Sequence, residues 1–251
     1  MTTQTDQSTA GRSPLLVFVH GFLDNRNAWS PLVQALAAAG YASTAFDLRG
    51  AGALQSSSGP YTLQQAVEDV VSHIGTPGGP LVLVGHSMGA QIAELAAVRL
   101  GSAVSALVLI TPTPLAGNVL PDEVRAMLRE SGGDAVAQQG IRRAFSRNLS
   151  AAQIDSATAA EVMMGKEAVR GYYDAFTGGD ASGTQTTACA VPVLILGAEE
   201  DPVIAPAMVR QIHQERFPGA ALGLVANSGH WPQLEQCEAT ARAIGHFLQG
   251  R

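Results

Sequence analysis

Residues 81–89 of the chain read LVLVGHSMG, and the helical pattern AQIAELAAVRL follows directly at 90–100. The four apolar residues predict a buried strand, and Gly85 and Gly89 flank a serine where that strand meets the helix. A sharp strand-to-helix turn forces the residue at its apex, Ser87, into strained geometry and leaves no room for a Cβ at the flanking glycines. The helix N-terminus beneath it favours developing negative charge. The stretch therefore predicts a nucleophilic serine held at the carboxyl edge of a sheet.

Short apolar runs alternate with helical patterns along the rest of the chain. Most runs are apolar throughout, which is typical of parallel strands covered on both faces. The alternation predicts an α/β fold with one mostly parallel sheet of about six strands. The expected strands are 15–19, 42–46, 81–84, 106–110, 192–196 and 221–226. The expected core helices lie around 29–36, over 62–74, from 88 to about 101, from 206 onward and over 235–248.

One long region interrupts this alternation. Residues 114–190 contain no good strand pattern, and we interpret them as a helical cap inserted over the carboxyl edge of the sheet. The predicted organisation is a disordered tail at 1–13, a core formed by 14–113 and 191–251, and the cap at 114–190. The helical patterns of the cap are 121–131, 134–147, 151–164 and 166–177.

The composition points to a small-molecule substrate rather than a macromolecular partner. With 251 residues, 46% of them hydrophobic, the chain can bury a sizeable core. A net charge of −6 with scattered arginines argues against a nucleic-acid or anionic-membrane surface. No apolar run approaches the ~20 residues that span a bilayer, and the polar opening does not resemble a secretory signal. We therefore expect a cytoplasmic protein with no nucleic-acid or membrane partner.

Ser87 needs a base, because an unassisted hydroxyl is a weak nucleophile. Of the six histidines, His230 follows the last expected strand on a loop at the same edge as Ser87, so we favour it as the base. The others occur within helical patterns or tight turns, and we interpret them as packing or structural residues. These are His20, His73, His86, His213 and His246.

The acid that orients the base is expected in EEDP, residues 199–202. A short carboxylate at the end of this turn, with Pro202 fixing the exit, favours Asp201 over Glu199 and Glu200. The strand at 106–110 ends in TPTP and offers no carboxylate.

A tetrahedral intermediate also needs hydrogen-bond donors for its oxyanion. We expect the backbone N–H of Met88, next to Ser87, and that of Phe22, in the turn after the first strand. Trp231 and the cap aromatics suggest a substrate pocket of modest size for an apolar group. The cap aromatics are Tyr172, Tyr173 and Phe176, although helical spacing places most of them in the core of the cap.

Together these motifs resemble the α/β-hydrolase superfamily, specifically its lidded branch of esterases, cofactor-free haloperoxidases and C–C bond hydrolases. The motifs occur in that family's order of nucleophile, acid and base. The matching stretches are HGF (20–22), DLRGAG (47–52), GHSMG (85–89), EEDP (199–202) and GHWPQLE (229–235). The resemblance implies a reaction that needs no cofactor, and the sequence contains no metal-ligand cluster or phosphate-binding loop.

The leading hypothesis is a serine hydrolase that cleaves a small, largely apolar carboxylic ester or lactone through an acyl-enzyme. Three alternatives keep the same residues: a C–C hydrolase of ring-cleavage products, suggested by Trp231, a cofactor-free haloperoxidase or perhydrolase, and a slow-turnover ligand receptor. Epoxide hydrolases and dehalogenases are disfavoured, since those relatives carry Asp at the position of Ser87 and usually Pro at that of Leu23.

The chain also departs from the family pattern at its start. The family usually has two antiparallel strands before the HGF strand, but only fourteen residues precede Leu15. We therefore expect a truncated sheet whose first edge, at 42–46, is shielded or paired in a homodimer.

Overall fold

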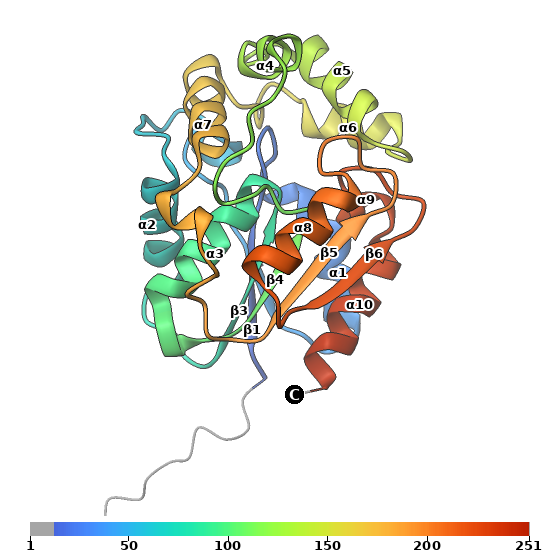
Figure 1. Cartoon of the computed structure of the whole chain (residues 1–251). Coiled ribbons are helices and arrows are strands. Elements are labelled where there is room, and N and C mark those ends of the chain that lie inside the picture. The colour runs from blue at the N-terminus through green and yellow to red at the C-terminus, as the bar shows by residue number, and fades with distance from the viewer. Residues whose placement is uncertain (1–12, 251) are drawn as a thin grey trace, which may run out of the picture.

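The computed structural model describes residues 13–250, and its centre is a sheet of six parallel strands (Figure 1). The strand order is β2-β1-β3-β4-β5-β6. The strands are β1 (Leu15–Val19), β2 (Ser43–Ala45), β3 (Leu81–His86), β4 (Val104–Ile110), β5 (Val193–Ala198) and β6 (Ala221–Val225). The predicted α/β-hydrolase fold with about six strands is confirmed.

The strands are apolar throughout because helices cover both faces of the sheet. Successive side chains of a strand point to opposite faces, so Leu81 and Leu83 of β3 join one buried cluster while Val82 and Val84 join the other. The first cluster packs against α2, α3 and α8, and the second packs against α1 and α10. The core helices are α1 (Ser30–Ala38), α2 (Leu63–Ile74), α3 (Met88–Leu100), α8 (Pro206–Arg216), α9 (Pro232–Glu235) and α10 (Cys237–Gln249).

Four helices between β4 and β5 lie over the carboxyl edge of the sheet, at the top of Figure 1, and we call them the cap. They are α4 (Asp122–Arg129), α5 (Ala135–Phe145), α6 (Ala151–Ala157) and α7 (Lys166–Gly178). The division into separate core and cap domains at residues 114 and 190 stays a prediction. The tail expected at 1–13 lies, apart from Ser13, outside the described residues.

The cap helix predicted over 151–164 is shorter than expected and ends at Ala157. The carbonyl of Ile154 accepts from both the N–H (3.1 Å) and the hydroxyl (2.9 Å) of Thr158, just beyond the last helical residue. The following segment then turns to the core, where the carbonyl of Val162 accepts from the N–H of Gly52 (3.0 Å). The segment that follows α6 thus contacts a loop more than a hundred positions away in the sequence.

Strand β2 forms one edge of the sheet, as the sequence predicts for 42–46. Its three side chains are half-buried, and within residues 13–250 it pairs with β1 alone. Pairing of this edge in a homodimer stays a prediction. None of the helices in the described part has the length and hydropathy that a membrane-spanning segment requires.

Candidate active site

Ser87 lies at the apex of the turn between β3 and α3. Its φ of 53° and ψ of −119° are unusual for a residue with a side chain, and such a conformation costs on the order of 1–3 kcal/mol. A Cβ at Gly85 would lie 2.2 Å from the carbonyl oxygen of Gly89, and one at Gly89 would lie 2.2 Å from that of Val19. Both glycines are therefore required for the turn, as predicted from GHSMG.

The structure brings Ser87, His230 and Asp201 into one hydrogen-bonded chain. The Oγ of Ser87 lies 3.0 Å from Nε2 of His230, and Nδ1 of His230 lies 2.8 Å from Oδ2 of Asp201. All three side chains are buried, with Ser87 at 8% exposure. Thr113, which the sequence analysis did not consider, places its hydroxyl 3.4 Å from that of Ser87. The arrangement can move a proton from the serine hydroxyl to the imidazole.

The electrostatics of the Ser87–His230–Asp201 hydrogen bonds favour a charged Asp201 carboxylate beside a basic His230 imidazole. Burial alone raises the pKa of Asp201, but the charge and hydrogen bond of His230, together with the N–H groups of Ile204 and Val203, outweigh it, so the pKa lies below its usual range. Burial lowers the pKa of His230, but attraction to Asp201, Asp24 and Glu235 exceeds that effect and leaves the pKa raised. An imidazole with a raised pKa is the stronger proton acceptor.

Two backbone N–H groups hold the Asp201 carboxylate in place. Its Oδ1 accepts from Val203 (2.8 Å) and Ile204 (3.0 Å), which leaves Oδ2 for the histidine. Of the two neighbouring glutamates, Glu200 instead forms a surface ion pair with Arg147 at 3.0 Å. The structure thus brings the predicted acid, and neither glutamate, to the base.

The turn after β1 lies against the serine turn. The N–H of Asp24 donates to the carbonyl of Gly21 (3.3 Å), and Leu23 has a φ of 62°. Within residues 13–250, the N–H groups of Phe22 and Met88 donate to no protein acceptor. Met88 is the first residue of α3, whose first N–H groups have no intrahelical acceptor. Both groups remain free to donate to an oxyanion.

His20 and His86 have structural contacts in the site, as their positions in tight turns suggest. Nε2 of His20 accepts from the N–H of Leu48 (3.0 Å). Nε2 of His86 donates to the carbonyl of His230 (2.7 Å), which fixes the backbone of the base. Neither ring takes part in the hydrogen bonds that join Ser87, His230 and Asp201.

A cavity of about 40 Å³, which we call the Ser87 pocket, opens beside the nucleophile. A buried water needs roughly 10–15 Å³ of such space, so the pocket as it stands holds only a small group. Its lining is mostly apolar, and among the described residues no lysine or arginine lines it. Lining side chains from the cap include those of Leu128, Ile141, Phe145 and Phe176.

Two of the four aromatic residues predicted for the pocket do line it, namely Trp231 and Phe176. Tyr172 does not, because its hydroxyl donates to the carbonyl of Arg49 (3.1 Å) and the side chain is fully buried. Tyr173 also does not line the pocket and instead packs behind Phe176, with ring centroids 5.3 Å apart. A buried tyrosine hydroxyl needs an acceptor, and that need orients Tyr172 toward the core.

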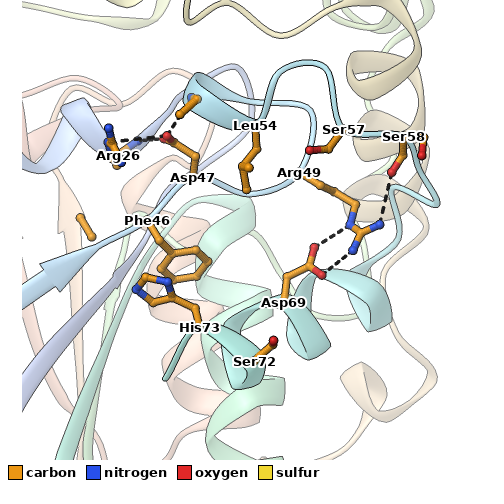
Figure 2. Close-up of a pocket in the computed structure, with 12 residues that line it drawn as sticks. Arg26, Phe46, Asp47, Arg49, Leu54, Ser57, Ser58, Asp69, Ser72 and His73 are labelled. Atoms are coloured by element: carbon orange, nitrogen blue, oxygen red, sulfur yellow. Dashed lines mark hydrogen bonds and ion pairs between the residues drawn. The ribbon is translucent and has the colours of Figure 1, made fainter. Parts of the chain in front are cut away.

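A second and much larger depression, about 640 Å³, lies beside β2, and we call it the β2 hollow (Figure 2). Its charged side chains bind one another: Arg49 forms two hydrogen bonds of 2.6 Å with Asp69. Its aromatic floor consists of Phe46 stacked on His73 at 4.4 Å between centroids. No member of the Ser87 chain lines it.

Sequence reasoning missed two buried charged residues and the role of a third. Asp24 and Arg142 form an ion pair at 3.1 Å, and Glu235 accepts hydrogen bonds from backbone N–H groups on both sides of His230. A signal for Arg142 was present, since it stands four residues after Gln138 and one after Ile141, on the stripe of α5 that is buried. A charge on such a stripe needs a buried partner.

Nothing in the described part of the chain is arranged to hold a metal ion, in the sense of three or more clustered His, Cys, Asp or Glu side chains. The site's own groups are a hydroxyl, an imidazole, a carboxylate and two free N–H groups.

Comparisons with known proteins agree with this architecture. A model of the alpha/beta hydrolase family matches residues 16–243. A pimeloyl-[acyl-carrier protein] methyl ester esterase of Stenotrophomonas maltophilia is 28% identical over 96% of this chain and 95% of its own. Among solved structures, an esterase from Exiguobacterium antarcticum superposes with a TM-score of 0.82 at 22% identity, covering 95% of this chain and 93% of its own. A bromoperoxidase from Bacillus anthracis has the same TM-score and coverage at 18% identity.

Proposed function

The chain belongs to the alpha/beta hydrolase family, and from this premise we propose that it is a serine hydrolase of small, largely apolar carboxylic esters or lactones. The observation that carries the proposal is the hydrogen-bonded chain from Ser87 through His230 to Asp201. The similarity to a methyl ester esterase over nearly the whole chain supports the same reaction class.

In the proposed reaction, Oγ of Ser87 attacks the carbonyl carbon of the ester while its proton passes to Nε2 of His230. The carbonyl oxygen becomes an oxyanion and accepts from the N–H groups of Phe22 and Met88. Collapse of the tetrahedral intermediate breaks the bond to the alcohol oxygen, which takes the proton from His230. Water then attacks the acyl-enzyme by the same steps in reverse and releases the acid. Asp201 keeps the imidazole oriented and stabilises its charged form.

The lining of the Ser87 pocket supports a neutral substrate. Ring-cleavage products carry carboxylates, and burying a negative charge is costly unless a positive charge pairs with it. Among the described residues that line the pocket, no lysine or arginine offers one. The volume of about 40 Å³ supports a short acyl group, since longer groups require the cap to move. This favours an ester hydrolase over a C–C hydrolase of ring-cleavage products.

The test is steady-state and pre-steady-state hydrolysis of p-nitrophenyl esters from acetate to octanoate. We expect saturable turnover that is fastest with acetate, and a covalent mass increase on Ser87 after treatment with a p-nitrophenyl phosphonate. Release of a single equivalent without turnover would instead indicate a ligand receptor. Faster cleavage of a ring-fission dienoate than of any ester would identify a C–C hydrolase. Peroxide-dependent halogenation that exceeds hydrolysis would favour the haloperoxidase alternative.

A further inference from the structure

A buried ion pair that has no step in the proposed reaction joins the cap to the turn that carries Phe22. Asp24 is 2% exposed and follows Leu23 in that turn, and Arg142 is 1% exposed and belongs to α5 of the cap. The two residues are separated by more than a hundred positions in the sequence. Their contact is therefore a purely tertiary feature of the molecule.

Arg142 binds the turn at two points with one nitrogen. Its Nη2 donates to the carbonyl of Leu23 (2.5 Å) and to Oδ1 of Asp24 (3.1 Å). The other carboxylate oxygen of Asp24 accepts from Nε1 of Trp231 (2.9 Å) and lies 3.5 Å from Nδ1 of His86. One carboxylate thus contacts side chains from the cap, from the loop of the base and from the turn of the nucleophile.

The opposite charges of Asp24 and Arg142 act on each other's pKa. Burial alone raises the pKa of Asp24, but the facing His86 ring, the charge of Arg142 and the Trp231 N–H lower it below its usual range. Nη1 of Arg142 is buried without a partner within residues 13–250. Buried ion pairs often add little net stability over an apolar replacement, because desolvation offsets their attraction. The stability of the fold alone therefore gives a weak reason for this pair.

The conformation of Leu23 gives a stronger reason. Its φ of 62° is one that a residue with a side chain rarely adopts, so the turn needs an external contact to hold it. The hydrogen bond from Arg142 to the Leu23 carbonyl is such a contact. Relaxation of Leu23 would rotate the peptide group between Phe22 and Leu23 and thereby move Phe22, whose N–H belongs to the next peptide group toward the N-terminus.

We propose that Arg142 is a positioning residue that holds the turn 21–24 in the conformation that presents the Phe22 N–H to the oxyanion, with Asp24 fixing its guanidinium. The cap thereby supplies part of the catalytic assembly in addition to covering the pocket. This inference rests on the proposed ester hydrolysis at Ser87.

A second buried ion pair provides a matched control. Arg216 and Glu94 lie 2.6 Å apart, with residue exposures of 7% and 3%. They join α8 to α3, and neither residue lines the Ser87 pocket. Loss of this pair should destabilise the fold as loss of the Asp24–Arg142 pair does, without touching the turn.

The experiment compares the variants Arg142→Met, Asp24→Asn/Arg142→Met and Arg216→Met, each assayed with p-nitrophenyl acetate well below its measured Tm. In Arg142→Met we expect kcat to fall about 10²-fold with KM within about threefold, since loss of one oxyanion donor costs roughly 10²–10³ in kcat. The double variant leaves no unpaired buried charge, so we expect its Tm to recover while kcat stays low. Arg216→Met should lower Tm but keep kcat within about twofold.

The double variant decides the question even if Arg142→Met does not fold. A kcat at least about tenfold below wild type in the folded double variant supports the proposal. A smaller loss overturns it, because charge compensation would then explain the pair. An Arg142→Lys variant, which keeps one cationic donor, should recover part of the loss. Ser87→Ala in the same assay separates failure of the Arg142 proposal from failure of the proposed function. If Ser87→Ala retains turnover, the proposed reaction itself is wrong.

Discussion

Two hollows of the molecule, the β2 hollow and the Ser87 pocket, contrast in both size and chemistry. The β2 hollow measures about 640 Å³, and its charged side chains already bind one another or backbone groups, as Arg49 binds Asp69. The Ser87 pocket measures about 40 Å³, yet its lining includes the strained Ser87 and also Phe22, whose N–H has no protein acceptor within residues 13–250. The contrast teaches that volume does not mark the reactive site here. The proposed site is marked instead by backbone N–H groups that have no protein acceptor within residues 13–250.

The largest expected effect comes from removing the nucleophile. In Ser87→Ala we expect kcat for p-nitrophenyl acetate to fall by about 10⁶, as in a known Ser-His-Asp hydrolase, because no group would remain to form the proposed acyl-enzyme. The circular dichroism spectrum and Tm should stay close to wild type. Retention of more than about 1% of wild-type kcat would remove Ser87 from the reaction and erase the contrast between the hollows.

The acid is the next most sensitive position. In Asp201→Asn we expect kcat to fall roughly 10³–10⁴-fold, because the amide no longer holds the imidazole in the required tautomer. Glu200→Gln is the control: that carboxylate binds Arg147 at the surface, and kcat should stay within about twofold. If the Glu200 variant were the crippled one, the acid would be misassigned.

Pocket volume should set the acyl-chain preference if the Ser87 pocket binds the acyl group. Phe176→Leu enlarges the lining, and we expect the ratio of kcat/KM for octanoate over acetate to rise about tenfold, within the range for a few methylene groups. Tyr172→Phe is the matched control, since Tyr172 lies in the same helix but outside the lining. An unchanged ratio in Phe176→Leu would locate the acyl group elsewhere.

The pH profile should report the charges around the base. His230 acts when neutral and its pKa is raised, so kcat/KM should fall as the pH drops through a pKa above the usual value of about 6.5. The facing carboxylates are those of Asp201, Asp24 and Glu235, while the neighbouring His86 ring donates to the His230 backbone. Asp24→Asn removes one negative charge and should move this acid limb to lower pH. A shift to higher pH would contradict that electrostatic assignment.

The smallest effect is expected in the β2 hollow. Asp69→Asn removes the partner of Arg49 at a half-exposed site, where an ion pair contributes roughly 0–1 kcal/mol to the free energy of unfolding. We expect kcat and KM for p-nitrophenyl acetate within about twofold of wild type. A tenfold loss of kcat would show that the larger hollow takes part in the reaction after all.

The sequence predicted the parts of this molecule that local patterns determine. Glycines at 85 and 89 predict the turn that carries Ser87, because the backbone crowding at these positions is a property of the turn itself. Ser87, Asp201 and His230 each follow the end of an apolar run, and parallel strands bring such ends to one edge. Position in the turn then favoured Asp201 among the carboxylates, and a loop position at the same edge as Ser87 favoured His230 among the histidines.

The features that escaped prediction depend on contacts between distant segments. Helix α6 stops at Ala157, and the segment beyond it contacts Gly52. Tyr172 points away from the pocket because its hydroxyl finds the carbonyl of Arg49. The partner of Arg142 lies more than a hundred positions away, and no periodicity encodes that pairing. Helical spacing predicts which face of a helix a residue lies on, but it does not predict which distant segment packs against that face.

The carboxylate of Glu235 has a consequence for protein engineering. Its oxygens accept from the N–H groups of Arg147 and Asn148, just beyond α5, and from those of Gly229 and Trp231, on either side of the base. The Glu235 side chain thus connects the segment that follows α5 to the loop that carries His230. A chimera that exchanges the cap for that of a relative should stay active only when segments 145–148 and 229–235 are transplanted together.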